Sequence, residues 1–288
     1  MIRLAVTTRA ETYHRLTTVL PARGIDVKYL QVDERIVELS PRNPPWDVDT
    51  VDLGYVYPSR LMEGGVADAL LSIPWLNDRD AVLQSRNKAG VLAAASDAGL
   101  PTPDTIFVSN PVDEDALVDA YRQIDGPVVI KPNSTTRGLG VARADDVDSL
   151  LGIVDYLNLL HDFDATGDKS YLLQEFIPNA RDVRVMVVDG AYAGAVERAR
   201  IDDTMEHWKH NVHRGGTANG VEVTETEREL AEAVADLLDI PLLGVDLLIT
   251  EEGPILSETN ARPTIDDLKK YESNFLDRFV DLIESLVE

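Results

Sequence analysis

Hydrophobic positions in the first 85 residues alternate between two periods, one typical of buried strands and one typical of amphipathic helices. Mainly apolar stretches at Ile2–Thr7, Ile25–Leu30 and Asp52–Tyr57 predict strands. The helical period of Glu11–Leu20 predicts a helix after the first strand, and the proline-rich stretch Pro41–Pro45 predicts a loop. Strands that alternate with helices in this way favour a small α/β lobe with an open, mostly parallel sheet.

The middle of the chain mixes both periods. An apolar-faced helix is expected at Val82–Ala98, where Gly99 and Pro101 would stop it. The other elements expected here are a helix at Asp113–Gln123, a strand at Gly126–Lys131, a loop at Asn133–Gly140, a second helix at Val147–Leu160 and a polar, mobile connection at Asp162–Lys169.

In the last third of the chain, apolar and polar residues mostly alternate with the period of two that is typical of strands. Asp189–Gly190 is typical of a tight turn between two strands. The expected elements are antiparallel strands at Tyr171–Phe176, Val183–Val188 and Ala191–Ala199, a capped amphipathic helix at Thr224–Leu238, a hairpin of Leu242–Ile249 with Ile255–Asn260, and a final helix from about Leu268.

These patterns predict three lobes in a mixed α/β and α+β protein. Residues 1–85 would form the N-terminal α/β lobe and residues 86–170 a small central α+β lobe. Residues 171–288 would form a C-terminal lobe built on an antiparallel sheet with helices.

Composition and charge narrow the class of protein. The chain has 51 acidic against 27 basic residues, a formal net charge of −24, and the acids are spread along its length. Such a surface repels phosphate backbones, so nucleic acid is not expected as a partner, and it is typical of adaptation to high salt. The chain has no cysteine and its apolar stretches are too short to span a bilayer, so we expect a cytoplasmic protein without membrane contact.

The last hairpin carries two carboxylates and an amide. Glu258 and Asn260 are two residues apart on one strand, so their side chains project from one face. A three-residue loop at Glu251–Gly253 would set Asp246 opposite Glu258, with Cβ atoms roughly 4.5–5.5 Å apart, whereas a two-residue loop would set it against an outward-facing neighbour. Oxygen ligands of this kind suit Mg²⁺. The alternative is a solvent-exposed strand face in an acidic protein.

A second candidate is the end of the strand at Lys131 with the loop Asn133–Gly140. A lysine at a strand end can bind a phosphate as a point charge. The small residues and backbone N–H groups of the loop, together with Arg137, can close over phosphates. The spacing of Gly138 and Gly140 matches neither a P-loop nor a dinucleotide fingerprint, and a glycine-rich hairpin tip is the alternative.

Two further segments have polar groups suited to a nucleotide and an anion. The backbone of Gln174–Ile177 can hold an adenine ring, with Glu175 accepting from the exocyclic amine and Asp182 accepting from a ribose hydroxyl; the alternative is an acid at a strand end. Cations and an amide suited to a phosphate or oxyanion cluster at Arg198, Arg200, Lys209, Asn211 and Arg214. In the same segment His207, His210 and His213 suggest either a zinc site or, in our preferred interpretation, ring packing or substrate hydrogen bonds.

Taken in order, these features resemble the ATP-grasp superfamily from about Leu76 to the end of the chain. The stretches HWKHNVHRGGTANGVEVT, GVDLLI and ETNARP resemble its RimK-like branch, which includes ligases that add glutamate to a ribosomal protein, to a carrier protein of lysine biosynthesis, or to pterin and deazaflavin coenzymes. The phosphate-covering loop is less glycine-rich than in many members, and ARPTID follows ETN where many members have another signature. In the N-terminal lobe only Arg60 is suggested as a substrate residue.

The resemblance implies ATP and Mg²⁺, or Mn²⁺, as cofactors, and roles for particular residues. These are Lys88 and Lys131 as nucleotide-contacting lysines, Ser134–Val141 with Gly138 and Gly140 as the mobile loop, Glu175, Phe176 and Ile177 at the adenine, Asp182 at the ribose, Asp246, Glu258 and Asn260 as metal ligands, and Arg184, Asn211 and Arg214 near the acyl phosphate.

The implied activity is ATP-dependent ligation of a carboxylate to an amine through an acyl phosphate, with an amino acid such as glutamate as the first substrate to consider. The acceptor would be a small molecule, a carrier protein or a protein terminus, and the enzyme would be a homo-oligomer. Two alternatives are a phosphotransferase that stops after phosphorylating its acceptor and a nucleotide-binding regulatory module without turnover.

Overall fold

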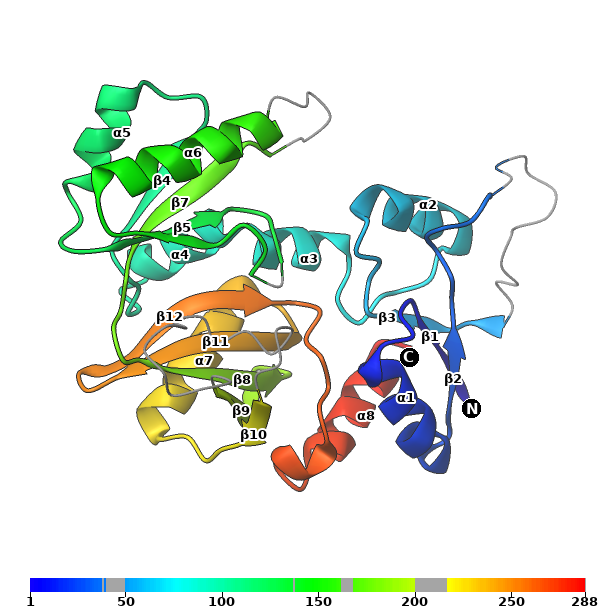
Figure 1. Cartoon of the computed structure of the whole chain (residues 1–288). Coiled ribbons are helices and arrows are strands. Elements are labelled where there is room, and N and C mark those ends of the chain that lie inside the picture. Colours follow the sequence, from blue (N-terminus) through cyan, green and yellow to red (C-terminus); the bar gives the residue numbers. More distant parts are fainter. Residues whose placement is uncertain (38, 40–49, 137, 162–167, 200–216, 288) are drawn as a thin grey trace.

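The computed structural model describes the chain except residues 38, 40–49, 137, 162–167, 200–216 and 288. Three sheets organise three units, and Figure 1 shows the central unit above the C-terminal sheet with the N-terminal unit beside it. In the described part of the chain, no helix combines the length and apolar character needed to cross a bilayer.

The N-terminal unit is the parallel α/β lobe expected from the sequence. Its strands pair in the order β2-β1-β3, all parallel. Its elements are β1 (Ile2–Val6), α1 (Glu11–Val19), a 3₁₀ turn (Leu20–Arg23), β2 (Ile25–Tyr29), β3 (Leu53–Tyr55) and α2 (Leu61–Leu71). Helix α2 was not predicted from the sequence; it contains the pair Gly64–Gly65 and begins after Arg60 without a side-chain cap.

The single helix expected at Val82–Ala98 is two helices, α3 (Arg79–Arg86) and α4 (Lys88–Asp97). Asn87 ends the first and caps the second, because its side chain accepts a hydrogen bond from the Gly90 N–H at 3.1 Å. An asparagine that satisfies backbone donors in this way competes with the continuous helix. The break places Lys88 at the first position of a new helix.

The central sheet is antiparallel with the order β4-β7-β5-β6. It consists of β4 (Thr105–Ser109), which the sequence analysis missed, β5 (Val128–Pro132), β6 (Ala142–Ala144) and β7 (Ser170–Glu175), with α5 (Glu114–Tyr121) and α6 (Val147–His161) packed on one face. Because β7 lies in the middle of this sheet, it does not pair with β8 and β9 as expected. The boundary expected between residues 170 and 171 falls inside the central sheet, which extends to Glu175.

The C-terminal sheet is antiparallel with the order β10-β9-β8-β11-β12. Its elements are β8 (Arg181–Val188), β9 (Ala191–Ala199), β10 (Thr217–Gly220), α7 (Glu225–Leu238), β11 (Leu242–Thr250), β12 (Gly253–Asn260), a 3₁₀ turn (Leu268–Lys270) and α8 (Phe275–Ser285). Helix α7 starts with the expected cap, in which Thr224 and Glu227 bond to each other's backbone N–H. The final helix begins at Phe275 rather than near Leu268.

The two faces of β8 have different neighbours. Val183, Val185 and Val187 pack in the same core as α7. Met186 and Val188 pack with α8 and the strands of the N-terminal unit. Side chains alternate along a strand, so Asp182 and Arg184 lie on the face opposite α7. That face of the sheet carries the polar site.

Candidate functional site

A β-bulge brings Asp246 and Glu258 to the same face of the C-terminal sheet. The expected three-residue turn is wrong, because Thr250 pairs with Gly253 across a two-residue turn. The ladder then shifts by one residue between Asp246 and Leu247, and Asp246 pairs with Glu258 as expected. Leu256 belongs to the core under α7, so without the extra residue Glu258 would point into that core.

Asp246 is fully buried and its carboxylate is shared by two arginines. Arg184 donates from Nε to Oδ1 at 2.6 Å and from Nη2 to Oδ2 at 2.7 Å, and Arg198 lies 2.9 Å from Oδ2. Burial alone would raise the pKa of Asp246, but the two guanidinium groups hold it well below its usual range. Asp246 is therefore ionised in the folded protein.

Glu258 has a different environment. Burial and the neighbouring Asp246 charge raise the pKa of Glu258, against the attraction of Lys88 and Lys131. The buried carboxylate of Asp246 and the half-buried one of Glu258 face each other, and a divalent cation would relieve their repulsion. Asn260 lies two residues further along β12 on the same face, and its Oδ1 accepts from the Arg262 N–H at 2.8 Å. Two carboxylates and an amide oxygen fit Mg²⁺ as a donor set.

Lys88 and Lys131 reach the same charge cluster from the central unit. Lys88 is buried, and its Nζ donates to the carbonyl oxygens of Asn133, at 3.3 Å, and Thr135. Lys131 donates to the Gln174 side chain. Burial lowers the pKa of both lysines, and the Glu258 charge opposes this effect. Both ammonium groups are close enough to Glu258 to interact with it across the two units.

The expected phosphate-covering loop is fastened at its base to the start of α4. The Asn133 side chain accepts from the Ala89 N–H and donates to Asn87 Oδ1, both at 2.9 Å. Gly138 and Gly140 have positive φ angles of 65° and 75°, and a Cβ on Gly140 would come within 2.7 Å of the Pro132 ring. Ser134, Gly138 and Gly140 are exposed, so the tip of the loop faces solvent.

The expected adenine and ribose residues form protein contacts. Glu175 accepts from the Asp104 N–H at 2.8 Å, and the Phe176 N–H donates to the Pro127 carbonyl. The Phe176 ring lies under the Arg143 guanidinium, 4.5 Å from its centroid, while Ile177 is half-buried. Asp182 accepts from Arg198 Nε at 3.0 Å.

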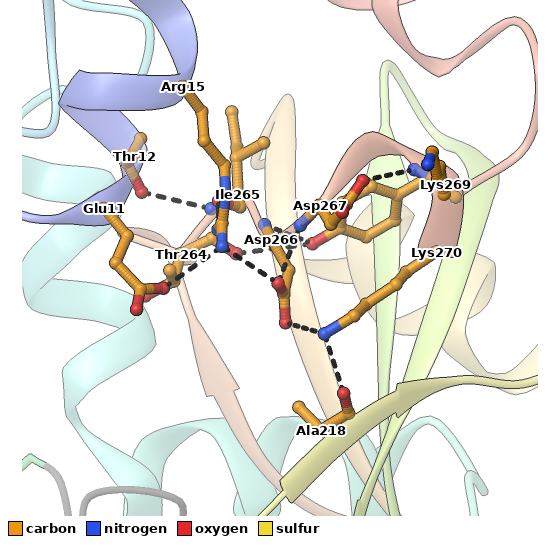
Figure 2. A network of polar contacts seen from close by, with 11 residues as sticks. Glu11, Thr12, Arg15, Ala218, Thr264, Ile265, Asp266, Asp267, Lys269 and Lys270 are labelled. Atoms are coloured by element: carbon orange, nitrogen blue, oxygen red, sulfur yellow. Dashed lines mark hydrogen bonds and ion pairs between the residues drawn. The ribbon is translucent and has the colours of Figure 1, made fainter.

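A polar network fixes the segment that follows β12 (Figure 2). On one side, Thr12 Oγ1 of α1 accepts from the Ile265 N–H at 3.1 Å, and Arg15 lies 3.2 Å from Asp266. On the other side, Lys270 Nζ donates to Asp266 at 2.9 Å and to the Ala218 carbonyl of β10 at 2.7 Å. The network joins the N-terminal helix to the C-terminal sheet.

Some residues of the candidate site were not predicted from the sequence. Others were predicted but lie outside the described residues. The sequence analysis missed the side chains that hold the lysines and the hairpin, namely Asn87, Asn133, Gln174 and Ser85, whose Oγ bonds Thr259 Oγ1 at 3.0 Å. Of these, Asn87 could have been predicted, because an asparagine three residues before Gly90 is a common helix N-cap. Asn211, Arg214, Arg200, Lys209, His207, His210, His213 and Arg137 fall outside the described residues. Arg60 is exposed and pairs with Glu34 and Glu63.

A family model and the curated relatives that match the chain agree on its family. A family model of the RimK-like ATP-grasp domain matches residues 85–283. A probable alpha-L-glutamate ligase of Shewanella halifaxensis is 31% identical over 201 residues, which is 69% of this chain and 41% of that protein. Another, from Legionella pneumophila strain Corby, is 31% identical over 213 residues, 73% of this chain and 66% of that protein. The chain thus spans less than two thirds of these relatives.

Solved structures resemble the whole chain. D-cycloserine synthetase DcsG matches with a TM-score of 0.76 at 17% identity, covering 100% of both chains. D-alanine–D-alanine ligase from Bacillus anthracis, complexed with ATP, matches with a TM-score of 0.71 at 15% identity, covering 99% of both. A RimK domain protein from Sphaerobacter thermophilus matches with a TM-score of 0.66 at 23% identity, covering 99% of this chain and 98% of that one. At these identities the matches show a shared fold.

Proposed function

The chain belongs to the RimK-like ATP-grasp family, and we propose that it is an ADP-forming ligase that joins a carboxylate to an amine. The ATP-grasp fold and the family expected from the sequence are thereby confirmed. The related proteins are named probable alpha-L-glutamate ligases, which supports glutamate as the first substrate to test.

One observation carries the proposal. Lys88 and Lys131 from the central unit and the facing Asp246 and Glu258 from the C-terminal sheet act on one another electrostatically. Cations on one side and metal-binding oxygens on the other are what a magnesium–triphosphate complex requires. The chain is strongly acidic, and these two lysines supply positive charge at a point where the surrounding surface is negative.

The chain's own residues have separable roles. Lys88 and Lys131 would contact the phosphates as point charges. Asp246, Glu258 and Asn260 would hold Mg²⁺, which when bound neutralises charge on phosphate oxygens. Arg184 and Arg198 share the Asp246 carboxylate and add positive charge to the same face, where a phosphate must later leave. Asn211 and Arg214 are proposed to stabilise the tetrahedral oxyanion, as the family resemblance implies.

The reaction has two balanced steps. The substrate carboxylate attacks the γ-phosphorus of ATP, the bond from phosphorus to the bridging oxygen breaks, and ADP leaves. The amine then attacks the carbonyl carbon of the acyl phosphate, loses a proton, and phosphate leaves. Closure of the loop at Ser134–Gly140 would exclude water and limit hydrolysis of the acyl phosphate.

The proposal extends to partners and location. The acid and amine would be small molecules, or one of them a carrier protein or a protein terminus, and the enzyme would work in the cytoplasm as a homo-oligomer. The absence of cysteine from the sequence and the high net negative charge support a cytoplasm of high salt content and argue against nucleic acid as a partner.

Product analysis tests the proposal. With ATP, Mg²⁺, L-glutamate and a panel of carboxylates in high-salt buffer, a ligase releases ADP and phosphate in equal amounts, and only when both acid and amine are present. ADP without free phosphate would indicate a phosphotransferase. Tight ATP binding with no substrate-dependent ADP would indicate a regulatory module, and either result would overturn the ligase.

A further inference from the structure

A polar cavity of about 260 Å³ lies at the edge of the N-terminal sheet. Its lining includes Thr7–Arg9, which directly follow β1, Tyr29 at the end of β2, and Ser59, four residues after β3. Open parallel α/β sheets bind their ligands beyond the carboxyl ends of their strands, and this cavity occupies that position. It is smaller than sites for drug-sized ligands, which run to roughly 300–1,000 Å³, so it suits a small metabolite rather than a nucleotide.

Three charged side chains line the cavity. Arg9 stacks on the Tyr29 ring, 4.2 Å from its centroid, and makes no ion pair with any described residue. Asp33 also lines the cavity and forms no ion pair within the described ranges. Arg262 is contributed by the segment that follows β12. Two guanidinium groups and one carboxylate in the lining suit a ligand that carries carboxylate groups together with an ammonium group.

One residue of the cavity lining is hydrogen-bonded to a proposed metal ligand. Arg262, which lines the cavity, donates its backbone N–H to Oδ1 of Asn260 at 2.8 Å. Further along the same segment, Ile265 and Asp266 are fastened to Thr12 and Arg15 of α1 (Figure 2). The segment that contributes Arg262 to the cavity thus contacts both the N-terminal unit and a residue of the proposed metal site.

We propose that this cavity binds an amino acid with a second carboxylate, such as glutamate, as a substrate of the ligase. Arg9 and Arg262 bind carboxylate groups and Asp33 binds the ammonium group. This inference rests on the proposed ligase function and adds to it the place where the amino acid binds. Arg60, the substrate residue suggested by the sequence, does not line the cavity and is engaged with Glu34 and Glu63.

Calorimetric titration tests the site on the full chain in high-salt buffer with Mg²⁺ and a non-hydrolysable ATP analogue. Wild-type protein should bind L-glutamate more tightly than glutarate, which lacks the ammonium group. Arg9→Gln should weaken L-glutamate binding by about 10- to 100-fold, the usual worth of a charge-assisted hydrogen bond, with unchanged affinity for the ATP analogue. Asp33→Asn should abolish the preference for L-glutamate over glutarate.

Arg122→Gln is the matched control, because it removes the same charge from the exposed C-cap of α5, where Arg122 pairs with Asp119. It should bind both ligands as the wild type does. Wild-type affinity for L-glutamate in Arg9→Gln, or an analogue-bound wild type that binds neither L-glutamate nor glutarate, would overturn the amino-acid site and leave the ligase proposal standing. Failure of the wild type to bind the ATP analogue would overturn the ligase proposal and this inference with it.

Discussion

The Arg184 guanidinium holds the Asp246 carboxylate through two parallel hydrogen bonds, at 2.6 and 2.7 Å, from the neighbouring strand β8. A bidentate pair of this kind fixes the orientation of the carboxylate as well as its charge. Glu258, directly across the ladder on the other side, therefore faces a carboxylate that cannot rotate away from it.

Glu258→Gln should abolish turnover and leave the fold intact. The substitution removes one of two facing carboxylates, so the protein without metal should be as stable as the wild type or more stable. Thermal unfolding with and without Mg²⁺-ATP would show the loss of ligand stabilisation, and a product assay would show the loss of activity. Glu252→Gln, in the exposed turn of the same hairpin, is the control. Undiminished turnover in Glu258→Gln would refute the metal assignment.

Lys131→Met should weaken ATP binding without unfolding the protein. The methionine keeps the apolar stem and removes an ammonium group whose burial lowers its pKa, so little folding free energy is lost. Loss of one charge-assisted phosphate contact should raise the Kd for ATP about 10- to 100-fold. Equilibrium binding of a fluorescent ATP analogue measures this effect. Lys269→Met, on the exposed 3₁₀ turn, should bind ATP normally.

Asn87→Ala should reduce both stability and nucleotide affinity. It removes the cap of α4, worth about 0.5–2 kcal/mol, and the acceptor for the Asn133 side chain at the base of the loop. Asp113→Ala removes a comparable cap from α5, where the Asp113 side chain accepts from the Asp115 N–H. Denaturant unfolding should show a loss in both variants, while ATP binding should weaken in Asn87→Ala only. Equal ATP affinity in the two variants would contradict a role for Asn87 in positioning Lys88.

Part of the strand geometry of the candidate site was predictable from local patterns. Glu258 and Asn260 share a strand face by the period of two, and Asp246 was expected opposite Glu258. The pairing is correct although the expected turn is wrong. The turn is one residue shorter than expected, and a bulge after Asp246, which no local pattern indicated, restores the register. The bulge is favoured by tertiary packing, which places Leu256 under α7 and Glu258 on the opposite face.

The contacts between strands that lie far apart in the sequence could not be predicted. Arg198 was singled out as an anion-binding cation, but its pairing with Asp246 and Asp182 depends on the order of strands in the sheet. Likewise, the sequence pattern groups β7 with the two strands that follow it. In the structure β7 instead pairs with β4 and β5 and so belongs to the central sheet. Strand order is set by packing between distant segments, which a period of two does not encode.

Raising the salt concentration should stabilise the protein. At a formal net charge of −24, surface carboxylates repel one another, and screening shortens the range of this repulsion from about 10 Å at 0.1 M to about 3 Å at 1 M salt. The thermal midpoint should therefore rise with KCl and most steeply below a few tenths molar. Choline chloride, with a bulky cation, should act similarly if screening is the cause. A midpoint that falls or stays constant with KCl would exclude adaptation to high salt.

The ion pair between Arg3 and Asp52 should make stability depend on pH. Arg3 donates from its backbone N at 2.7 Å and from Nε at 2.9 Å to Asp52, and the side-chain bond lowers the pKa of Asp52 below its ordinary value of 3.8. A carboxyl whose pKa is lower in the folded state stabilises the fold at pH above its unfolded value, and this contribution is lost as the pH falls through the folded value.

Asp52→Asn should accordingly cost about 1 kcal/mol of unfolding free energy at pH 6, because the ion pair is partly exposed, and progressively less below pH 3.8. Urea unfolding of wild type and variant at several pH values measures the difference. Asp97→Asn, which removes a negative charge from an exposed helix end, corrects for the general relief of repulsion in an acidic protein. If the corrected difference is the same at pH 3 and pH 6, Asp52 contributes through its neutral hydrogen bonds and its charge adds nothing to stability.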